Sequence, residues 1–114
     1  MKKVVSILGT PYTIKIGISR KADKYLSDSD GYCDPINHLI VIAEKNEEYS
    51  DDEWARYSKI CLRHEIVHAF MFESGIDGNC KWDIQDQTHP EFMVSWIANQ
   101  FPKLIEAFNK VDAI

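Results

Sequence analysis

The sequence is poor in cysteine, in excess positive charge and in long hydrophobic runs, and each absence excludes a class of protein. Its three cysteines, Cys33, Cys61 and Cys80, are odd in number and lack paired spacing. They predict reduced thiols in a cytoplasmic protein, and they argue against a disulfide framework or a cysteine-ligated zinc site. No stretch approaches the ~20 apolar residues of a membrane-spanning helix, so we expect no membrane partner.

Charge and composition narrow the remaining classes. The formal net charge is −5, and no basic run extends beyond Lys2-Lys3 and Arg20-Lys21, so nucleic acid is not an expected partner. Hydrophobic residues make up 45% and charged residues 27%, which is typical of a folded globular chain. The length of 114 residues is close to the commonest domain size and predicts a single domain over residues 1–114.

The first half of the chain has the pattern of β-strands. Residues 3–8 are rich in valine and isoleucine, but the run is too short for a signal peptide and ends at residues 9–11. Residues 12–18 alternate between apolar and polar side chains, which predicts a strand with one buried face and half of a hairpin. After a polar loop over residues 19–30, we expect a short strand, a turn and a buried strand within residues 31–43.

A long central helix is expected to begin after Ser50 and to run to about Ser74. Ser50 followed by Glu53 fits a capping box, and Gly75 can supply the left-handed residue that ends the helix. One apolar arc carries Leu62, Ile66, Ala69 and Phe70, and a second carries Tyr57, Ile60, Cys61, Met71 and Phe72. Because a helix that is apolar on both sides favours burial, we expect this one to lie between layers.

Two further helices are expected after a loop over residues 75–87. The first begins near Thr88 and runs to about Gln100. The pair Phe101-Pro102 is expected to break it, because proline disfavours the helical conformation in the residue before it. Pro102 can then serve as the first residue of a last helix over residues 102–111.

The motif His64-Glu65-x-x-His68 lies inside the expected central helix. Residues four apart in an α-helix lie almost in line, so the two imidazoles project from one face, one turn apart. Two imidazoles at this spacing can hold a single zinc ion. Glu65 lies beside them and can act as a general base toward a water. The alternative is a core helix whose histidines hydrogen-bond to their neighbours.

A catalytic zinc site needs a third protein ligand, with water in the fourth position. The longer motif with a third histidine is excluded, because Met71 and Ser74 stand where it needs glycine and histidine. Glu91, near the start of the next expected helix, is the preferred third ligand. His89 is a further candidate and fits a role beside the ligands or in the transition state better than ligation. The weaker candidates lie in the preceding loop: Asp77, Asp83 and Asp86.

Some of these residues have a second interpretation. Thr88-x-x-Glu91 is itself a capping-box pattern, so Glu91 can cap a helix instead of binding metal. His38 falls in a turn, where a surface histidine is favoured over a metal ligand. No residue is clearly placed to stabilise an oxyanion, and the candidates for that role are Tyr32, Tyr57 and His89.

A His-Glu-x-x-His helix followed by a glutamate on the next helix resembles the gluzincin metallopeptidases. The chain is more closely similar to small phage and bacterial zinc peptidase-like proteins related to the ImmA/IrrE family. The matching stretches are residues 8–12, 31–34, 62–70, 73–75 and 91–98. The resemblance implies an α+β, minimal zincin-like fold, in which a small, twisted, mostly antiparallel sheet packs on the His-Glu-x-x-His helix, with further C-terminal helices. It also implies that residues 31–43 supply an edge strand that holds an extended peptide.

The function that follows from this resemblance is zinc-dependent hydrolysis of a peptide or protein substrate. His64, His68 and Glu91 are then the zinc ligands, and Glu65 is the general base. A phage or prophage origin is implied by the resemblance alone. Two alternatives stay open: a non-catalytic protein-binding module with a zincin fold, and a zinc hydrolase that acts on a non-peptide bond.

Overall fold

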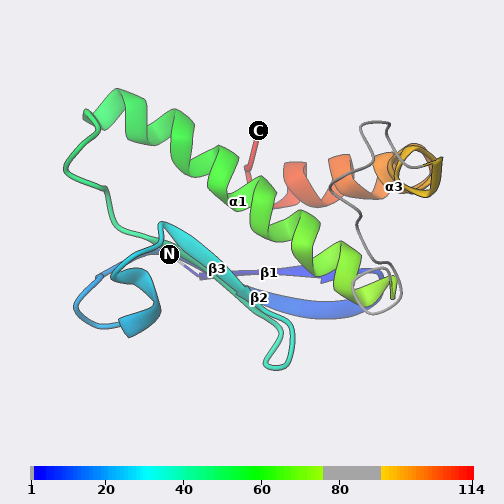
Figure 1. Cartoon of the computed structure of the whole chain (residues 1–114), viewed down its shortest axis with the longest axis horizontal. Coiled ribbons are helices and arrows are strands. Elements are labelled where there is room, and N and C mark those ends of the chain that lie inside the picture. The colour runs from blue at the N-terminus through cyan, green and yellow to red at the C-terminus, as the bar shows by residue number, and fades with distance from the viewer. Residues whose placement is uncertain (1, 76–90) are drawn as a thin grey trace.

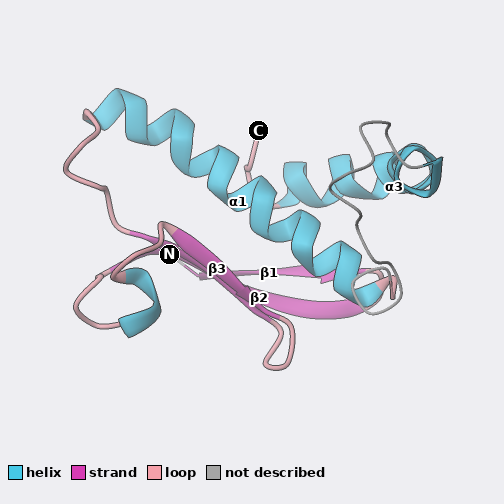
Figure 2. Cartoon of the chain, in the orientation of Figure 1, coloured by secondary structure: helices cyan, strands magenta, loops and turns pink. Residues whose placement is uncertain are grey.

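The computed structural model describes residues 2–75 and 91–114 of the chain. The elements are β1 (Lys2–Ile7), β2 (Thr10–Ile18), the 3-10 helix η1 (Lys24–Leu26), β3 (Gly31–Asp34), β4 (Leu39–Ala43), α1 (Asp51–Glu73) and α3 (Glu91–Lys110). The strands precede the helices and the two kinds of element form separate layers, so the fold class is α+β, as predicted (Figure 2). Neither described helix combines the length and the apolar character needed to cross a bilayer.

The four strands form one sheet in the order β1-β2-β4-β3. The pairs β1–β2 and β3–β4 are antiparallel, whereas β2 and β4 run parallel. The sheet is therefore mixed, which refines the expectation of a mostly antiparallel one. Within residues 31–43, the expectation of an edge is correct only for β3, because β4 pairs with a strand on each side.

A tight turn joins β1 to β2. Leu8 and Gly9 have φ angles of 51° and 93°, and positive φ at both central residues defines the turn that best fits the twist of a hairpin. Because two residues complete this turn, Thr10 and Pro11 already belong to β2, where they pair with Ile7 and Ser6. The break between the two strands was expected over residues 9–11, but it ends at Gly9 and β2 begins at Thr10.

The two α-helices, α1 and α3, lie on one side of the sheet and build the core there (Figure 1). The strands contribute alternate residues to this core, which include Ile7, Tyr12, Ile14, Ile40 and Ile42. The helices contribute Leu62, Ile66, Ala69 and Phe70 from α1 and Leu104, Ala107 and Val111 from α3. On the opposite face, Leu26 of η1 covers Val41 and Ala43. Both faces of the inner strand β4 are therefore buried.

The central helix begins and ends close to the predicted residues. The Ser50 side chain accepts a hydrogen bond from the Glu53 amide at 3.2 Å, and the Glu53 carboxylate accepts one from the Ser50 amide at 2.9 Å. Gly75, with a φ of 84°, follows the helix. The expectation of burial on both sides is wrong, because Ile60 and Phe72 in the second arc are exposed. The sheet covers α1 along the first arc, which carries Leu62, Ile66, Ala69 and Phe70.

The capping box makes a direct contribution to stability. We expect Ser50→Ala to lower the free energy of unfolding by about 1 kcal/mol, since it leaves the Glu53 amide without its acceptor. Urea denaturation measures the change. Ser58→Ala, a matched change inside the same helix, should be neutral or slightly stabilising because alanine is the better helix former. Equal losses in both variants would show that the cap is not the cause.

The C-terminal helix is continuous, so the predicted break at Phe101-Pro102 and the separate helix over residues 102–111 are wrong. Pro102 lies inside α3. A helix can keep an internal proline by bending, which relieves the clash between the ring and the preceding turn. In Figure 1 the part of α3 before Pro102 is seen nearly end-on, and the later part runs across the view.

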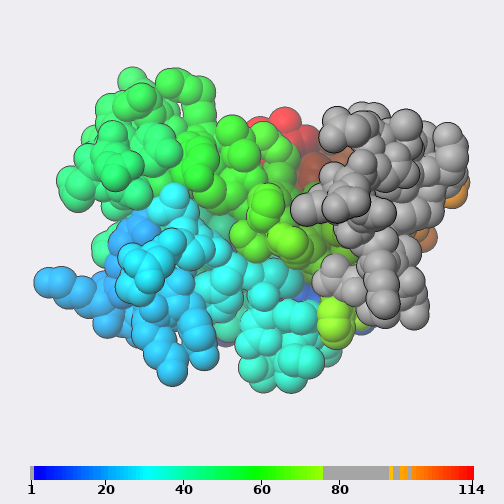
Figure 3. All heavy atoms as spheres, viewed as in Figure 1, coloured from blue at the N-terminus to red at the C-terminus, as the bar shows by residue number. Residues whose placement is uncertain are grey.

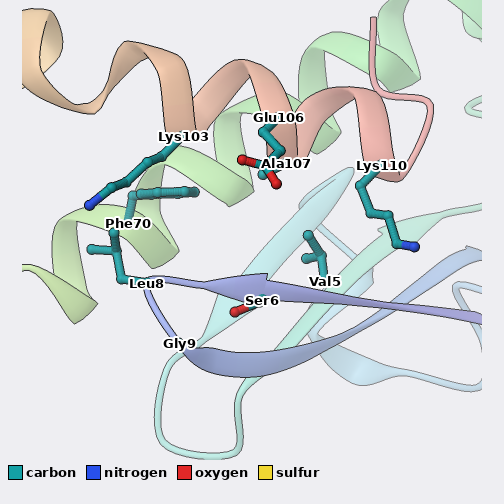
Figure 4. A pocket seen from close by; sticks show the side chains of 9 residues that line it. All are labelled: Val5, Ser6, Leu8, Gly9, Phe70, Lys103, Glu106, Ala107 and Lys110. Atoms are coloured by element: carbon teal, nitrogen blue, oxygen red, sulfur yellow. The ribbon is translucent and has the colours of Figure 1, made fainter.

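A hollow of about 560 Å³ separates the later part of α3 from β1 (Figure 4). Its floor includes Val5, Leu8 and Phe70, and Lys103 and Lys110 extend from α3 at its rim. The hollow has none of the clustered metal-ligand groups that α1 carries. We interpret it as a packing seam between the sheet and α3.

Candidate metal centre

The motif residues occupy neighbouring positions on α1 with different exposures. His64 and His68 are exposed, whereas Glu65 is buried. This arrangement follows from the apolar arc of the helix: Ile66 and Ala69 are fully buried against the core, which turns the histidines away from it. The same packing that fixes α1 on the sheet therefore sets the direction of both imidazoles.

The two imidazoles converge, as the spacing of four residues predicted. Their Nε2 atoms lie 3.1 Å apart, and their ring planes meet at 71°. This separation is that of a hydrogen bond between the two rings. Two zinc–nitrogen bonds of ~2.0–2.1 Å at a tetrahedral angle place the nitrogens about 3.3–3.4 Å apart, so a small change in ring orientation would let both bind one ion. Ligand atoms of His64, Glu65 and His68 all lie within 4.8 Å of one another. The group has the donors to hold a divalent metal ion.

Glu65 lies between α1 and the edge strand β3, which are side by side in Figure 3. A Cβ placed on Gly31 of β3 would lie only 2.8 Å from Ile42 Cδ1 and 3.0 Å from the Val41 carbonyl oxygen, both on β4, and 3.8 Å from Glu65 Cγ. The missing side chain therefore lets β3 pack closely against β4, and Glu65 is in ordinary van der Waals range of the same position. Burial raises the pKa of Glu65 above its ordinary value, and the neighbouring His64 and His68 act in the opposite direction.

The C-terminal end of α1 is fixed by a partly buried polar contact. The Tyr12 hydroxyl donates to Glu73 Oε1 at 2.9 Å, and the Thr10 hydroxyl donates to Glu73 Oε2 at 3.3 Å. Burial, followed by the hydrogen bond to Glu73, raises the pKa of Tyr12. This anchor was not predicted, because Tyr12 and Glu73 are far apart in sequence and each looks ordinary in its own element.

The remaining predicted site residues fall into two groups. Glu91 is the first residue of α3, and its side chain lies outside the described part of the structure. His89 and the loop aspartates Asp77, Asp83 and Asp86 also lie outside the described residues. The prediction of a third ligand therefore stays a prediction.

His38 and the two tyrosines are within the described residues, and each is engaged elsewhere. His38 occupies the β3–β4 turn with a φ of 52°, and its ring lies against Tyr12 as expected of a surface histidine. The Tyr32 hydroxyl donates to Asp23. The Tyr57 hydroxyl bonds to the thiol of Cys61. Neither tyrosine therefore presents a free hydroxyl to an oxyanion.

The chemistry of the centre is thus that of two imidazole donors beside one shielded carboxylate. Such a set suits zinc and other divalent metals that accept nitrogen ligands. Cys33 and Cys61 are thiols that border the same region, and Cys80 lies outside the described residues. A comparison of the chain with known protein families, with curated proteins and with solved structures finds no match.

Proposed function

We propose that the protein is a cytoplasmic, zinc-dependent metallopeptidase with a minimal zincin-like fold. The observation that carries the proposal is the convergence of His64 and His68, with Nε2 atoms 3.1 Å apart, beside the buried carboxylate of Glu65. The resemblance of the motif to the gluzincin and ImmA/IrrE families supports the same reaction. We assign His64, His68 and Glu91 as the metal ligands.

When bound, zinc supplies a Lewis acid for the scissile carbonyl and lowers the pKa of a coordinated water to about 7. Glu65 then accepts a proton from the attacking water and transfers it to the leaving amine. The position of Glu65 between α1 and β3 suits this role, because the surrounding side chains shield the carboxylate from bulk water. The buried arc of α1 keeps both imidazoles oriented, which avoids the cost of ordering them when the metal binds.

The position of β3 favours a peptide as the substrate. β3 is an edge strand, and it runs beside the face of α1 that carries Glu65. An edge strand presents unpaired backbone groups that can pair with an extended peptide. A peptide added to β3 would place its backbone beside the histidines. Non-peptide substrates have no comparable reason to bind at a strand edge.

The test of this proposal is zinc binding and its dependence on Glu91. We expect the wild-type chain to bind one zinc ion, and Glu91→Gln to weaken that binding at least about tenfold, since even the loss of a group that only orients a ligand costs 10- to 100-fold. Competition with a chromophoric chelator measures both affinities. Glutamine keeps the capping ability of glutamate at this position of a helix, so the change separates ligation from capping.

Glu106→Gln, an exposed substitution on the same helix, is the matched control and should leave zinc affinity unchanged. An unchanged affinity in Glu91→Gln would show that Glu91 is a cap and that the third ligand lies elsewhere. A wild-type chain that binds no zinc would overturn the proposed function as a whole.

A second candidate function is a protein-binding module that holds zinc without catalysis. The observation in its favour is that the hydroxyls of Tyr32 and Tyr57 are both engaged, by Asp23 and Cys61. A hydrolase needs a donor for the developing oxyanion, and removal of such a donor typically costs 100- to 1,000-fold in rate. One bound zinc without cleavage of any peptide in a diverse library would favour the binding module.

A further inference from the structure

Four residues of α1 at intervals of four form one exposed stripe: Ile60, His64, His68 and Phe72. Each lies only 40° around the helix from the one before, at 100° per residue. Ile60 is 52% exposed and Phe72 is 39% exposed. A single exposed apolar residue needs no explanation. Here, however, one large apolar side chain stands beyond each histidine, at the two ends of the candidate metal centre.

Two hollows lie between this stripe and β3, one on each side of Glu65. The first has a volume of about 220 Å³ and is lined by Tyr57, Ile60 and Cys61 beside His64. The second has a volume of about 290 Å³ and is lined by Cys33, Pro35 and Phe72 beside His68. Both also touch Gly31 and Glu65. The two hollows are therefore neighbours along one groove, with the general base between them.

The size of each hollow suits one side chain. A complete small-molecule pocket is usually ~300–1,000 Å³, and each hollow is smaller than that range. Cys61 of the first hollow and His68 of the second are seven residues apart on α1, which is about 10 Å along the helix axis. An extended peptide rises ~3.3 Å per residue and turns every second side chain to the same face, so side chains two or four residues apart can reach the two hollows.

The charges along β3 disfavour acidic side chains in this groove. Gly31 lies next to Asp30, and the strand ends at Asp34, which is half-buried. Asp30 is paired with Arg20 at 2.7 Å, but Glu65 and Asp34 have no cation within salt-bridge distance among the described residues. A peptide that brings acidic residues beside Asp34 would meet a like charge, whereas at the centre of the groove the charge of a bound zinc ion would offset that of Glu65.

We propose that the groove selects extended peptides with an apolar side chain on each side of the scissile bond, both on the same face of the peptide. The inference rests on the proposed function, because it takes Glu65 and the histidines as the centre of the reaction. Ile60 and Phe72 are the residues that determine this specificity. Each acts by covering one apolar substrate side chain, and neither takes part in the chemistry.

To test the inference, a mixture of unstructured peptides is digested with the zinc-loaded protein, and the cleavage sites are identified by mass spectrometry. We expect apolar residues to be enriched on both sides of the cleaved bonds and acidic residues to be depleted. Ile60→Asn should reduce the enrichment on one side, and Phe72→Ser should reduce it on the other. Both positions are exposed, so both variants should fold. Loss of an apolar contact in a pocket changes discrimination by ~10- to 200-fold, and we expect about tenfold for these half-exposed contacts.

Val4→Ser is the matched control, since Val4 is 54% exposed on β1, at the other edge of the sheet, and should leave the cleavage pattern unchanged. Cleavage without any flanking preference, or a preference that neither groove variant alters, would overturn the inference.

A measurement of peptide binding distinguishes failure of this inference from failure of the proposed function. If the wild-type protein cuts nothing, hydrolysis fails as the function, and fluorescence anisotropy of labelled peptides on the zinc-loaded Glu65→Gln protein decides the rest. Preferential binding of peptides with two apolar residues, weakened about tenfold by Ile60→Asn or Phe72→Ser, supports the groove. Equal binding of apolar and acidic peptides, or no binding of either, contradicts it.

Discussion

Replacement of Glu65 by glutamine is expected to slow peptide hydrolysis by about 100- to 10,000-fold while zinc stays bound. Glutamine has nearly the same shape as glutamate but cannot accept a proton from water at neutral pH. The ligand nitrogens of His64 and His68 are untouched by the change, because Glu65 lies between the helix and β3 and makes no hydrogen bond to either ring. Initial rates with a cleavable peptide, together with zinc content, measure the two halves of the prediction.

Glu48→Gln is the matched control for this substitution. Glu48 is exposed in the turn before α1, so the same chemical change there should alter neither rate nor zinc content. A Glu65→Gln protein that hydrolyses peptide at the wild-type rate would remove Glu65 as the base. Loss of zinc in that variant would instead indicate that the Glu65 carboxylate is itself a ligand, which its proximity to both imidazoles allows.

Local sequence signals predicted the parts of the fold that depend on neighbours along the chain. The capping box at Ser50 and the glycine after Ser74 placed both ends of α1, because caps are read within one turn of a helix. The alternation over β2 predicted the burial of Tyr12 and Ile14 for the same reason. The convergence of His64 and His68 also follows from helix geometry alone.

The features that the sequence did not predict depend on contacts between distant segments. Nothing local indicates that β4 pairs parallel with β2, which leaves β3 rather than the whole region 31–43 at the edge. Pro102 predicted a break because proline is unfavourable in an isolated helix, but tertiary packing on both sides of it keeps α3 continuous. The exposure of Ile60 and Phe72 likewise depends on which arc of α1 meets the sheet.

Truncation of Phe70 is expected to have the largest effect on stability. Phe70 is 1% exposed on α1, and it packs in the core between the sheet and α3. Loss of a buried phenylalanine side chain costs ~3–5 kcal/mol through lost apolar burial and the cavity that remains. Natural domains have a free energy of unfolding of only about 5–15 kcal/mol, so Phe70→Ala should leave the protein barely stable. Urea denaturation of the metal-free protein measures the loss.

Phe101→Ala removes the same side chain from an exposed position on α3 and should change the stability by less than about 0.5 kcal/mol. The Phe70 variant also tests how the core supports the metal centre, because Phe70 lies two residues after His68 on the same helix. A ligand that binds only the folded state, at 100 times its dissociation constant, adds ~2.7 kcal/mol to stability. Zinc should therefore restore much of the loss in Phe70→Ala, and it should restore none in a Phe70→Ala, His68→Ala double variant. Equal restoration in both would place the zinc somewhere other than the two imidazoles.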